Sequence, residues 1–346
     1  MKSIRWGILG TGKIATHFAN DFAYTKTGEL KAIASRNKVT ANQFAQRFNI
    51  ELAFQDYFSL INSDQVDAIY IAVPHVYHYE LTKACILAGK AVLCEKPFTL
   101  NQHQSTELYE LAEQHQVFVM EAMWTRFNPM IEQVIDWVAD GEIGLLSSIQ
   151  ASFNFVAPTD PTHRLNNKAL GGGALLDIGI YPVFLAQLFW GLPDFVQSQA
   201  ILNDDDIDMS VQTLLGWDHG GLAVLDTSLI SKSSNRATLS GSEGYIEIDN
   251  HWHKAKSCRL VDKNDREHAV EFDFPGMGYQ FEIDEVNRCL EEGLLQSPNF
   301  TWSNSLDLIT TLDEIRADIG VEYPQEHISE PANIEEHHHE HHHHKH

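Results

Sequence analysis

The stretch Ile4-Arg5-Trp6-Gly7-Ile8-Leu9-Gly10-Thr11-Gly12-Lys13-Ile14-Ala15 decides the fold of this chain. Its first half reads as a buried strand and its second half opens a helix, with G-x-G-x-x-G/A directly between them. The first glycine permits a tight turn, the second lets a pyrophosphate approach the backbone, and the alanine allows close packing of helix on strand. The helix amino end adds free N–H groups and a positive dipole. An isolated match would be an ordinary strand–helix turn, but this context predicts a dinucleotide-binding loop formed by Gly10, Thr11, Gly12, Lys13 and Ile14.

Strand and helix patterns alternate from this loop onward through the first third of the chain. Such alternation predicts βαβ units and an open parallel sheet with right-handed crossovers. We therefore predict an α/β fold whose N-terminal domain, 1–123, is a Rossmann-type doubly wound parallel sheet. The expected strands are 4–9, 30–34, 68–73, 91–94 and 117–121, and the expected helices are 13–22, 40–48, 78–88 and 102–115.

The alternation of strand and helix patterns ends after Met123. Successive strand patterns with turn signals, and no helices between them, fill 195–274, which predicts an antiparallel sheet. We expect a C-terminal α+β domain, 124–326, with a large, mostly antiparallel sheet. Its other expected elements are a strand at 147–155 and helices at 129–139, 174–190, 279–292 and 305–319.

The composition of the chain limits its partners. With 346 residues, two domains that each bury a core are expected. The net charge of -24 argues against nucleic acid and anionic membranes as partners, and no apolar run approaches a membrane span. No signal peptide is suggested. The four cysteines show neither metal-site spacing nor the density of a disulfide scaffold, so reduced, buried thiols in a cytoplasmic protein are expected.

The tail 327–346 is set apart by its histidines. The segment 335–346 holds eight of the chain's 19 histidines, which cannot belong to a packed core. We expect a disordered, solvated end without a catalytic role. Weak binding of zinc, nickel or copper is the alternative that imidazole groups offer.

The end of the second strand indicates which dinucleotide is preferred. About 20 residues beyond the glycines, an NAD enzyme usually carries Asp or Glu for the ribose 2′-hydroxyl. This chain has Ser35, Arg36 and Asn37 there and no acid. A hydroxyl and a guanidinium suit a 2′-phosphate, so the residues predict NADP(H) over NAD. The alternative is that Arg36 merely covers the sheet edge.

A lysine stands at the exit of the expected strand 91–94. The sequence runs Ala91-Val92-Leu93-Cys94-Glu95-Lys96-Pro97, and strand carboxyl ends are where such sheets hold ligands. Pro97 restricts Lys96 to extended geometry. This fixes the position from which the ammonium group projects toward a bound cofactor or substrate. A surface Lys-Pro turn is the alternative.

The segment 171–182, GGGALLDIGIYP, carries two more polar residues with site potential. Asp177 and Tyr181 are four apart and share a face of the expected helix. Pro182 removes a helical N–H and crowds the carbonyl of Ile178, so a local irregularity is expected beside them. A core tyrosine and a dipole-stabilised helix-start aspartate are the alternatives.

Taken together, the glycine motif, Glu95-Lys96-Pro97 and the segment 171–182 resemble the glucose–fructose oxidoreductase/inositol dehydrogenase (Gfo/Idh/MocA) superfamily. The resemblance is strongest to its dimeric dihydrodiol dehydrogenase and NADP-dependent D-xylose dehydrogenase branch. It implies a hydride transfer between a nicotinamide and a substrate hydroxyl, with Tyr181 as acid/base. A free tyrosine is only ~0.1% phenolate at neutral pH, so a nearby positive charge is needed, and Lys96 is the candidate. The alternatives are proton transfer by Lys96 itself and a merely orienting Tyr181.

The same resemblance implies further site residues. His78 matches a histidine of relatives and is expected near the cofactor, with a capping or supporting role as the alternative. Trp124 and Arg126 begin the second domain and are expected at the cleft, although Trp124 also suits a domain-junction core. The predicted cofactor site adds Pro74, His78, Glu95, Lys96, Trp124 and Arg126, and the predicted substrate site comprises Trp124, Phe153, Asp177 and Tyr181. Phe153 is a weaker candidate, as are Phe155 and Trp252, because alternating aromatic residues on a strand usually belong to the core.

The resulting expectation is an NADP-dependent oxidoreductase acting on a cyclic polyol, either an aldose such as D-xylose or a trans-dihydrodiol. No residue distinguishes the two substrates. The alternatives are an NADP(H)-sensing protein without turnover and a redox-assisted glycoside hydrolase. A homodimer is expected because the second-domain helices are too few to cover both faces of its sheet. No metal site is expected.

Overall fold

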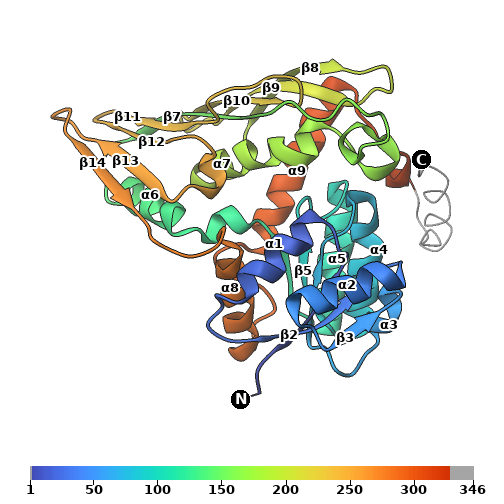
Figure 1. Cartoon of the computed structure of the whole chain (residues 1–346). Coiled ribbons are helices and arrows are strands. Elements are labelled where there is room, and N and C mark those ends of the chain that lie inside the picture. The colour runs from blue at the N-terminus through green and yellow to red at the C-terminus, as the bar shows by residue number, and fades with distance from the viewer. Residues whose placement is uncertain (1, 328–346) are drawn as a thin grey trace. The chain divides into compact units, whose positions relative to one another are not determined.

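The computed structural model describes residues 2–327, and its elements are labelled in Figure 1. The described chain divides into two compact units. Among the described residues, the first unit contains 2–123, Pro275–Trp302 and 324–327, and the second contains Trp124–Phe274 and Ser303–Tyr323. The histidine-rich tail lies outside the described residues. The predicted domain limits of 1–123, 124–326 and 327–346 stay a prediction.

The first unit is built on a six-stranded parallel sheet in the order β3-β2-β1-β4-β5-β6, which confirms the doubly wound fold. The chain reverses direction across the sheet between β1 and β4, the place where such sheets bind ligands. The strands are β1 (Arg5–Leu9), β2 (Glu29–Ala34), β3 (Leu52–Phe54), β4 (Ala68–Ile71), β5 (Ala91–Glu95) and β6 (Val119–Ala122). The helices are α1 (Lys13–Phe22), α2 (Lys38–Phe48), α3 (Tyr57–Ile61), α4 (His78–Leu87), α5 (Gln102–His115) and α8 (Tyr279–Glu291).

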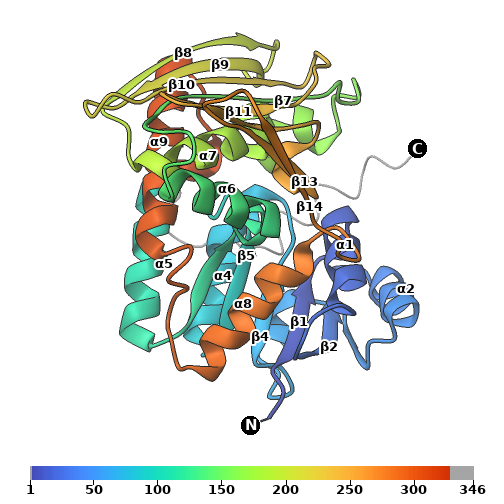
Figure 2. The same cartoon turned by 90° about the vertical axis from the view of Figure 1, so that its left-hand side faces the viewer.

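The central strands of this sheet are buried along their whole length. Every residue of β4, β5 and β6 is buried, which is why their sequences lack the alternation of a half-exposed strand. Helices α1 and α8 pack together on one face and α4 and α5 on the other (Figure 2). The short elements β3 and α3 were not predicted. With three and five residues they are too short for a periodic signal.

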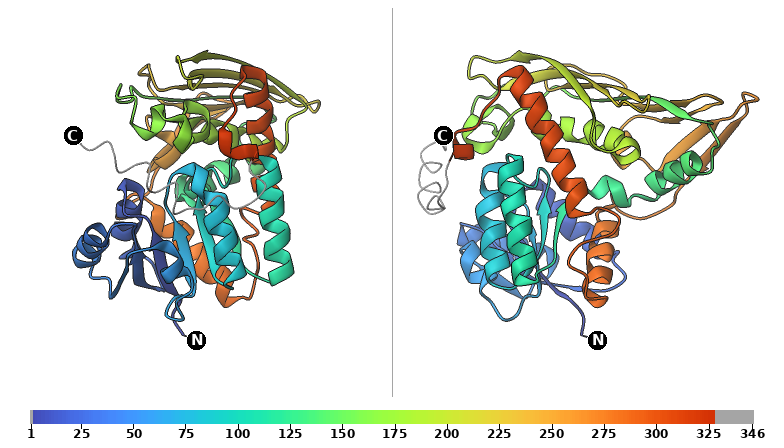
Figure 3. Two further views of the ribbon diagram at one scale, coloured as in Figure 1. Left: turned by 90° about the vertical axis from the view of Figure 1, so that its right-hand side faces the viewer. Right: turned by 180° about the vertical axis from the view of Figure 1, so that it is seen from behind.

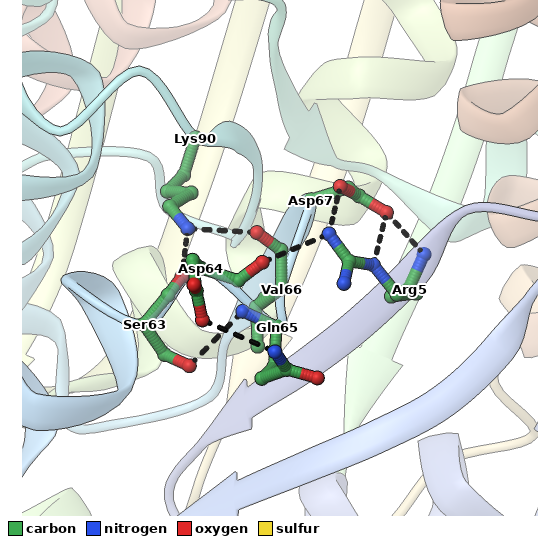
Figure 4. A network of polar contacts seen from close by, with 7 residues as sticks. All are labelled: Arg5, Ser63, Asp64, Gln65, Val66, Asp67 and Lys90. Carbon is green, nitrogen blue, oxygen red and sulfur yellow. Dashed lines mark hydrogen bonds and ion pairs between the residues drawn. The ribbon is translucent and has the colours of Figure 1, made fainter.

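A polar network joins the amino ends of β1, β4 and β5 (Figure 4). The Arg5 guanidinium donates to both carboxylate oxygens of Asp67, at 2.9 and 3.0 Å, and to the carbonyl of Asp64. The pKa of Asp67 is lowered, chiefly because Arg5 donates to it. Lys90, just before β5, donates to the carbonyl of Val66 at 2.7 Å. These contacts hold the sheet at the edge opposite the strand carboxyl ends.

Helix α8 returns to the first unit from late in the sequence. The carboxylate of Asp21 on α1 accepts backbone N–H groups of Met277, Gly278 and Tyr279 at 3.0–3.2 Å and so caps the start of α8. Farther along α8, the Asn287 side chain accepts the indole N–H of Trp6 at 2.8 Å and donates to the carbonyl of Thr27. Since Trp6 is fully buried, α8 completes the core beneath β1.

The second unit is built on an eight-stranded sheet in the order β14-β13-β12-β11-β7-β10-β9-β8. Only the β7–β10 pair within this sheet is parallel, which confirms the predicted mostly antiparallel sheet. The strands are β7 (Leu146–Asn154), β8 (Phe195–Leu202), β9 (Asp208–Gly216), β10 (Leu222–Ser228), β11 (Ala237–Gly241), β12 (Tyr245–Ile248), β13 (Ser257–Val261) and β14 (Glu267–Glu271). The main helices are α6 (Pro129–Ala139), α7 (Ile180–Trp190) and α9 (Trp302–Ile319).

Helices cover one face of this sheet. Helix α7 packs on β7 and β10, and α6 packs on β13. The views in Figures 2 and 3 show no helix of residues 2–327 on the opposite face. That face carries exposed apolar side chains. Their shared orientation follows from the strand registers, and they are Phe195, Ile201, Leu222, Val224 and Tyr245.

The expected helix 174–190 contains a π-helical turn, Leu175–Gly179, before α7 begins. The N–H of Ile180 reaches the carbonyl of Leu175, five residues back. Pro182 explains the change, because it offers no N–H to Ile178 and the regular hydrogen-bond pattern cannot continue through it. The predicted irregularity is therefore present; the π-helical turn contains Asp177 and ends two residues before Tyr181.

Among residues 2–327, one stretch is long and apolar enough to span a membrane. The segment Lys168–Trp190 has a mean hydropathy of 1.6, but 89% of its apolar window is buried inside the structure. The expectation that no apolar run approaches that length was wrong for this segment, which is the core helix of the second unit. The four cysteines, Cys85, Cys94, Cys258 and Cys289, are free and buried.

Candidate active site

The glycine loop has the geometry of a phosphate cradle. Gly10 has φ of 105°, and a Cβ there would lie 2.2 Å from the carbonyl oxygen of Ala72, so only glycine fits. A Cβ at Gly12 would meet nothing within 4 Å, which leaves the approach to the backbone open. No side chain caps the start of α1, and its first turn holds no acidic residue. Its amino end therefore suits the pyrophosphate of a dinucleotide.

The end of β2 presents one buried and one exposed polar side chain. Ser35 is buried and its hydroxyl lies 2.6 Å from the hydroxyl of Thr40. Arg36 is exposed and also hydrogen-bonds to Tyr57, whose pKa is nonetheless raised because burial outweighs that contact. The Asn37 side-chain oxygen accepts the N–H of Val39 at 2.8 Å and thereby caps α2. The Arg36 guanidinium and the Ser35 hydroxyl therefore lie at the end of β2, where dinucleotide-binding folds contact the ribose.

The Lys96 turn is held from three sides. Glu95 and Lys96 are 7% and 5% exposed, and the Lys96–Pro97 peptide bond is cis. The Glu121 carboxylate accepts the N–H of Phe98 at 2.8 Å. The His78 ring nitrogens lie 2.6 Å from the carbonyl oxygen of Pro97 and 2.9 Å from that of Val73. The turn at the end of β5 is therefore rigidly supported.

The His78 ring lies between the turns that follow β4 and β5. It is fully buried, and burial lowers its pKa to about 4, so the ring is neutral near pH 7. Carbonyl oxygens only accept hydrogen bonds, so a neutral imidazole satisfies one of its two carbonyl neighbours at a time. His78 thus connects the turn after β4 to the turn after β5.

Sequence analysis missed a second buried carboxyl beside Glu95. Tyr70 donates its hydroxyl to Glu95 at 2.5 Å. Glu282, on α8, is fully buried, and among the described residues neither of its carboxyl oxygens has a hydrogen-bond partner. Burial, followed by repulsion from Glu95 and Asp21, raises the pKa of Glu282 well above its usual range. Nothing local in the sequence pairs residues 95 and 282.

The second unit gathers the predicted substrate residues around the hydroxyl of Tyr181. Tyr181 is 5% exposed, and the indole N–H of Trp124 donates to its oxygen at 2.7 Å. Phe153 stacks on the Tyr181 ring with centroids 5.4 Å apart. The structure thus brings together three of the four predicted substrate residues.

His253 is a member of this cluster that sequence analysis missed. Its ring centroid lies 4.4 Å from that of Phe153, 4.9 Å from that of Tyr181 and 5.9 Å from that of Trp124. It follows the turn residue His251, which has φ of 58°. Because residue 253 stands far from the others in sequence and outside any motif, no pattern pointed to it.

Asp177 lies in the π-helical turn with a partner of its own. Its carboxylate accepts from the Arg164 guanidinium at 2.9 Å. Arg164 belongs to the polar loop before the glycine-rich segment and was not predicted. The ion pair combines a nearly buried aspartate with a half-exposed arginine, whose side chains are 11% and 43% exposed.

Three further candidates, Arg126, Trp252 and Phe155, have an ion-pair partner or pack in the core. Arg126 pairs with Glu132 on α6. Trp252 is fully buried and donates to the carbonyl of Ser152 at 2.9 Å, as a core residue does. Phe155 packs against a buried cluster around Leu165 and Ile178. Among residues 2–327, no group of three or more His, Cys, Asp or Glu side chains could hold a metal ion.

The chain matches two family models and a relative of nearly the same length. Residues 4–123 match a model described as an oxidoreductase family with an NAD-binding Rossmann fold, and residues 131–247 match the GFO/IDH/MocA C-terminal domain. Trans-1,2-dihydrobenzene-1,2-diol dehydrogenase of Xenopus laevis is 33% identical over 338 residues, covering 92% of this chain and 99% of that protein.

Two solved structures are similar along nearly the whole chain. A 3-ketoreductase from Actinomadura kijaniata, in complex with NADP and TDP-benzene, is 28% identical with a TM-score of 0.83, covering 92% of this chain and 98% of that one. An aldose-aldose oxidoreductase from Caulobacter crescentus, complexed with glycerol, shares the fold at 23% identity and a TM-score of 0.84, again covering 92% and 98%. This chain belongs to the GFO/IDH/MocA family of NAD(P)-binding oxidoreductases.

Proposed function

We propose that this protein is an NADP-dependent dehydrogenase of a cyclic polyol, either an aldose or a trans-dihydrodiol. The observation that carries the proposal is the buried Tyr181 hydroxyl, set among aromatic rings in a family of oxidoreductases. Aromatic faces pack on the ring of such a substrate and exclude water from it. The dihydrodiol dehydrogenase named above supports this substrate class.

In this proposal Tyr181 moves the proton of the reacting hydroxyl. The bound nicotinamide would supply the hydride acceptor in oxidation and the hydride donor in reduction. Tyr181 takes the hydroxyl proton in oxidation and returns it in reduction. Lys96 favours the phenolate form of Tyr181 by its positive charge. Asp177 orients the substrate through its carboxylate, which the Arg164 guanidinium holds in place.

The proposed cofactor site consists of the residues predicted from the sequence. Gly10, Thr11, Gly12, Lys13 and Ile14 hold the pyrophosphate. Ser35 and Arg36 bind the 2′-phosphate, and the NADP-bound ketoreductase supports this preference. The proposed nicotinamide neighbours are Pro74, His78, Glu95, Lys96, Trp124 and Arg126.

A panel of aldoses, polyols and trans-dihydrodiols, incubated with NADP, tests the function. Steady formation of NADPH with one class identifies the substrate. Binding of NADP without turnover of any compound would instead mean a sensing protein. A Tyr181→Phe variant with near wild-type kcat would refute the assigned acid/base, whereas Lys96→Met is expected to shift the pH dependence of kcat and to lower it.

We also propose a homodimer formed through the open face of the eight-stranded sheet. Leu222, Val224 and Phe195 are each about half exposed there, at 52%, 51% and 49%. A two-fold axis lets such a face cover itself. Val224→Lys is expected to shift sedimentation toward a monomer, and a monomeric wild-type protein at micromolar concentration would contradict the proposal. The four buried, free thiols support a cytoplasmic location.

A further inference from the structure

The contact between Trp124 and Tyr181 has a fixed direction. An indole nitrogen donates a hydrogen bond and cannot accept one. The Tyr181 oxygen therefore accepts the Trp124 N–H at 2.7 Å, between two buried side chains. Its own O–H hydrogen must point elsewhere. The Trp124 N–H thus occupies one side of the Tyr181 oxygen. The hydroxyl proton of Tyr181 then points to the other side of that oxygen.

Such a donor acts on the ionised form of the phenol. A hydrogen bond to a charged acceptor is stronger than one to a neutral acceptor, so the N–H stabilises the phenolate more than the phenol. The effect grows in a buried setting, where water does not compete. Trp124 therefore does two things at once: it orients the tyrosine proton and favours its release.

Trp124 is held in place for this role. It opens the 3-10 turn Trp124–Phe127, and the next residue, Thr125, donates its hydroxyl to the carbonyl of His253 at 2.7 Å. Asn128 donates to the carbonyl of Ala255 at 3.0 Å. The turn that carries Trp124 is therefore tied to the loop that carries His253, and His253 packs on both rings.

We propose that Trp124 is the positioning residue of the Tyr181 acid–base centre, fixing its proton and stabilising its phenolate through the indole N–H. This rests on the proposed function only for the catalytic use of Tyr181. It gives Trp124 a task beyond substrate packing. Ionisable groups of the second unit near Tyr181 include His253, with His251 at 6.3 Å from it between ring centroids, and the Asp177–Arg164 pair in the preceding turn; Lys96 acts in addition under the proposed function.

The test removes the N–H and keeps an aromatic ring. In Trp124→Phe, the ionisation of Tyr181 is followed by ¹³C NMR of protein labelled at the tyrosine ring carbon that bears the oxygen. Tyr181→Phe identifies the resonance. At a fixed alkaline pH the phenolate-to-phenol ratio is expected to fall about tenfold, the size of one hydrogen bond to a charged group. Where turnover is found, kcat should fall by a similar factor while KM changes little.

Trp217→Phe is the matched control. Trp217 also donates its indole N–H in the second unit, but to the carbonyl of Gly191 at 3.0 Å. It should leave the Tyr181 resonance and its titration unchanged. Trp124→His restores a ring N–H donor and is expected to recover part of the phenolate.

The outcomes separate this inference from the proposed function. A Tyr181 titration that is the same in Trp124→Phe as in the wild-type protein would overturn the inference, as would a Trp124→His protein no closer to wild type than Trp124→Phe. Absence of turnover with every polyol would instead count against the proposed function, and it would leave the NMR comparison intact.

Discussion

The buried carboxyl group of Asp208 contacts the start of the helix that carries Tyr181, and its ionisation should lower the free energy of unfolding. Its side chain is 1% exposed and accepts the N–H of Leu175, the first residue of the π-helical turn, at 2.7 Å. Gly173 has φ of 128°, and a Cβ there would lie 2.3 Å from the Asp208 carboxylate. Burial raises the Asp208 pKa from 3.8 to about 6, against the attraction of Arg316 and the backbone N–H groups.

The sign and size of the effect follow from this shift. Because the folded-state pKa is raised, the folded protein is favoured by this group below pH 3.8, and that advantage is lost as the pH rises through about 6. A shift of about two units at about 1.4 kcal/mol per unit corresponds to a loss of about 3 kcal/mol. In Asp208→Asn the amide oxygen still accepts the Leu175 N–H, but nothing titrates.

Urea unfolding of Asp208→Asn and wild type across this pH range measures the loss. The free energy of unfolding of the variant, relative to wild type, should rise by about 3 kcal/mol between pH 3.8 and the range above about pH 6. Any constant cost of the amide cancels in this comparison. Asp204→Asn, at an exposed site in the same β8–β9 connection, is the control. Parallel pH profiles for wild type and Asp208→Asn would refute the reasoning.

Three further substitutions test other parts of the first unit. Arg36→Ala should lower kcat/KM with NADP about tenfold or more while changing that with NAD little, because a charged hydrogen bond to the 2′-phosphate is lost; equal losses with both cofactors would contradict this. Glu282→Gln should raise the thermal midpoint more at alkaline than at acidic pH, since the raised pKa of Glu282 means that its ionisation destabilises the folded state; an equal change at both would count against it. Gly10→Ala should abolish dinucleotide binding measured by calorimetry, because its Cβ would lie 2.2 Å from the Ala72 carbonyl oxygen, and Gly220→Ala, at an open turn, is the control for a positive-φ glycine.

The structural features that could be predicted from the sequence were those determined by neighbouring residues in the chain. Strand and helix periods identified the alternation around Gly10, and the missing N–H of Pro182 predicted the irregular turn beside Tyr181. The three-residue strand β3 left no period to detect. The helix pattern of α8 was visible, but its period does not say which sheet the helix covers.

The parts that escaped prediction depend on contacts between distant residues. Trp124 was predicted as a substrate residue, yet its hydrogen bond to Tyr181 joins positions 57 residues apart. His253 and Arg164 lie in irregular segments, where no spacing rule indicates which way a side chain faces. Glu282 sits on a helix whose polar positions are usually solvated, and only the fold shows that it is buried.

The return of α8 also affects how the protein is made. Trp6 is buried and donates to Asn287, 281 residues later in the sequence. The Asp21 carboxylate accepts hydrogen bonds from the N–H groups of residues 277–279, which are also made late in synthesis. During synthesis the nucleotide-binding sheet therefore leaves the ribosome with an uncovered tryptophan, and it cannot close its core until most of the chain has emerged. Contacts this far apart in sequence slow folding. Apolar surface that stays exposed during translation makes such an incomplete domain prone to aggregation.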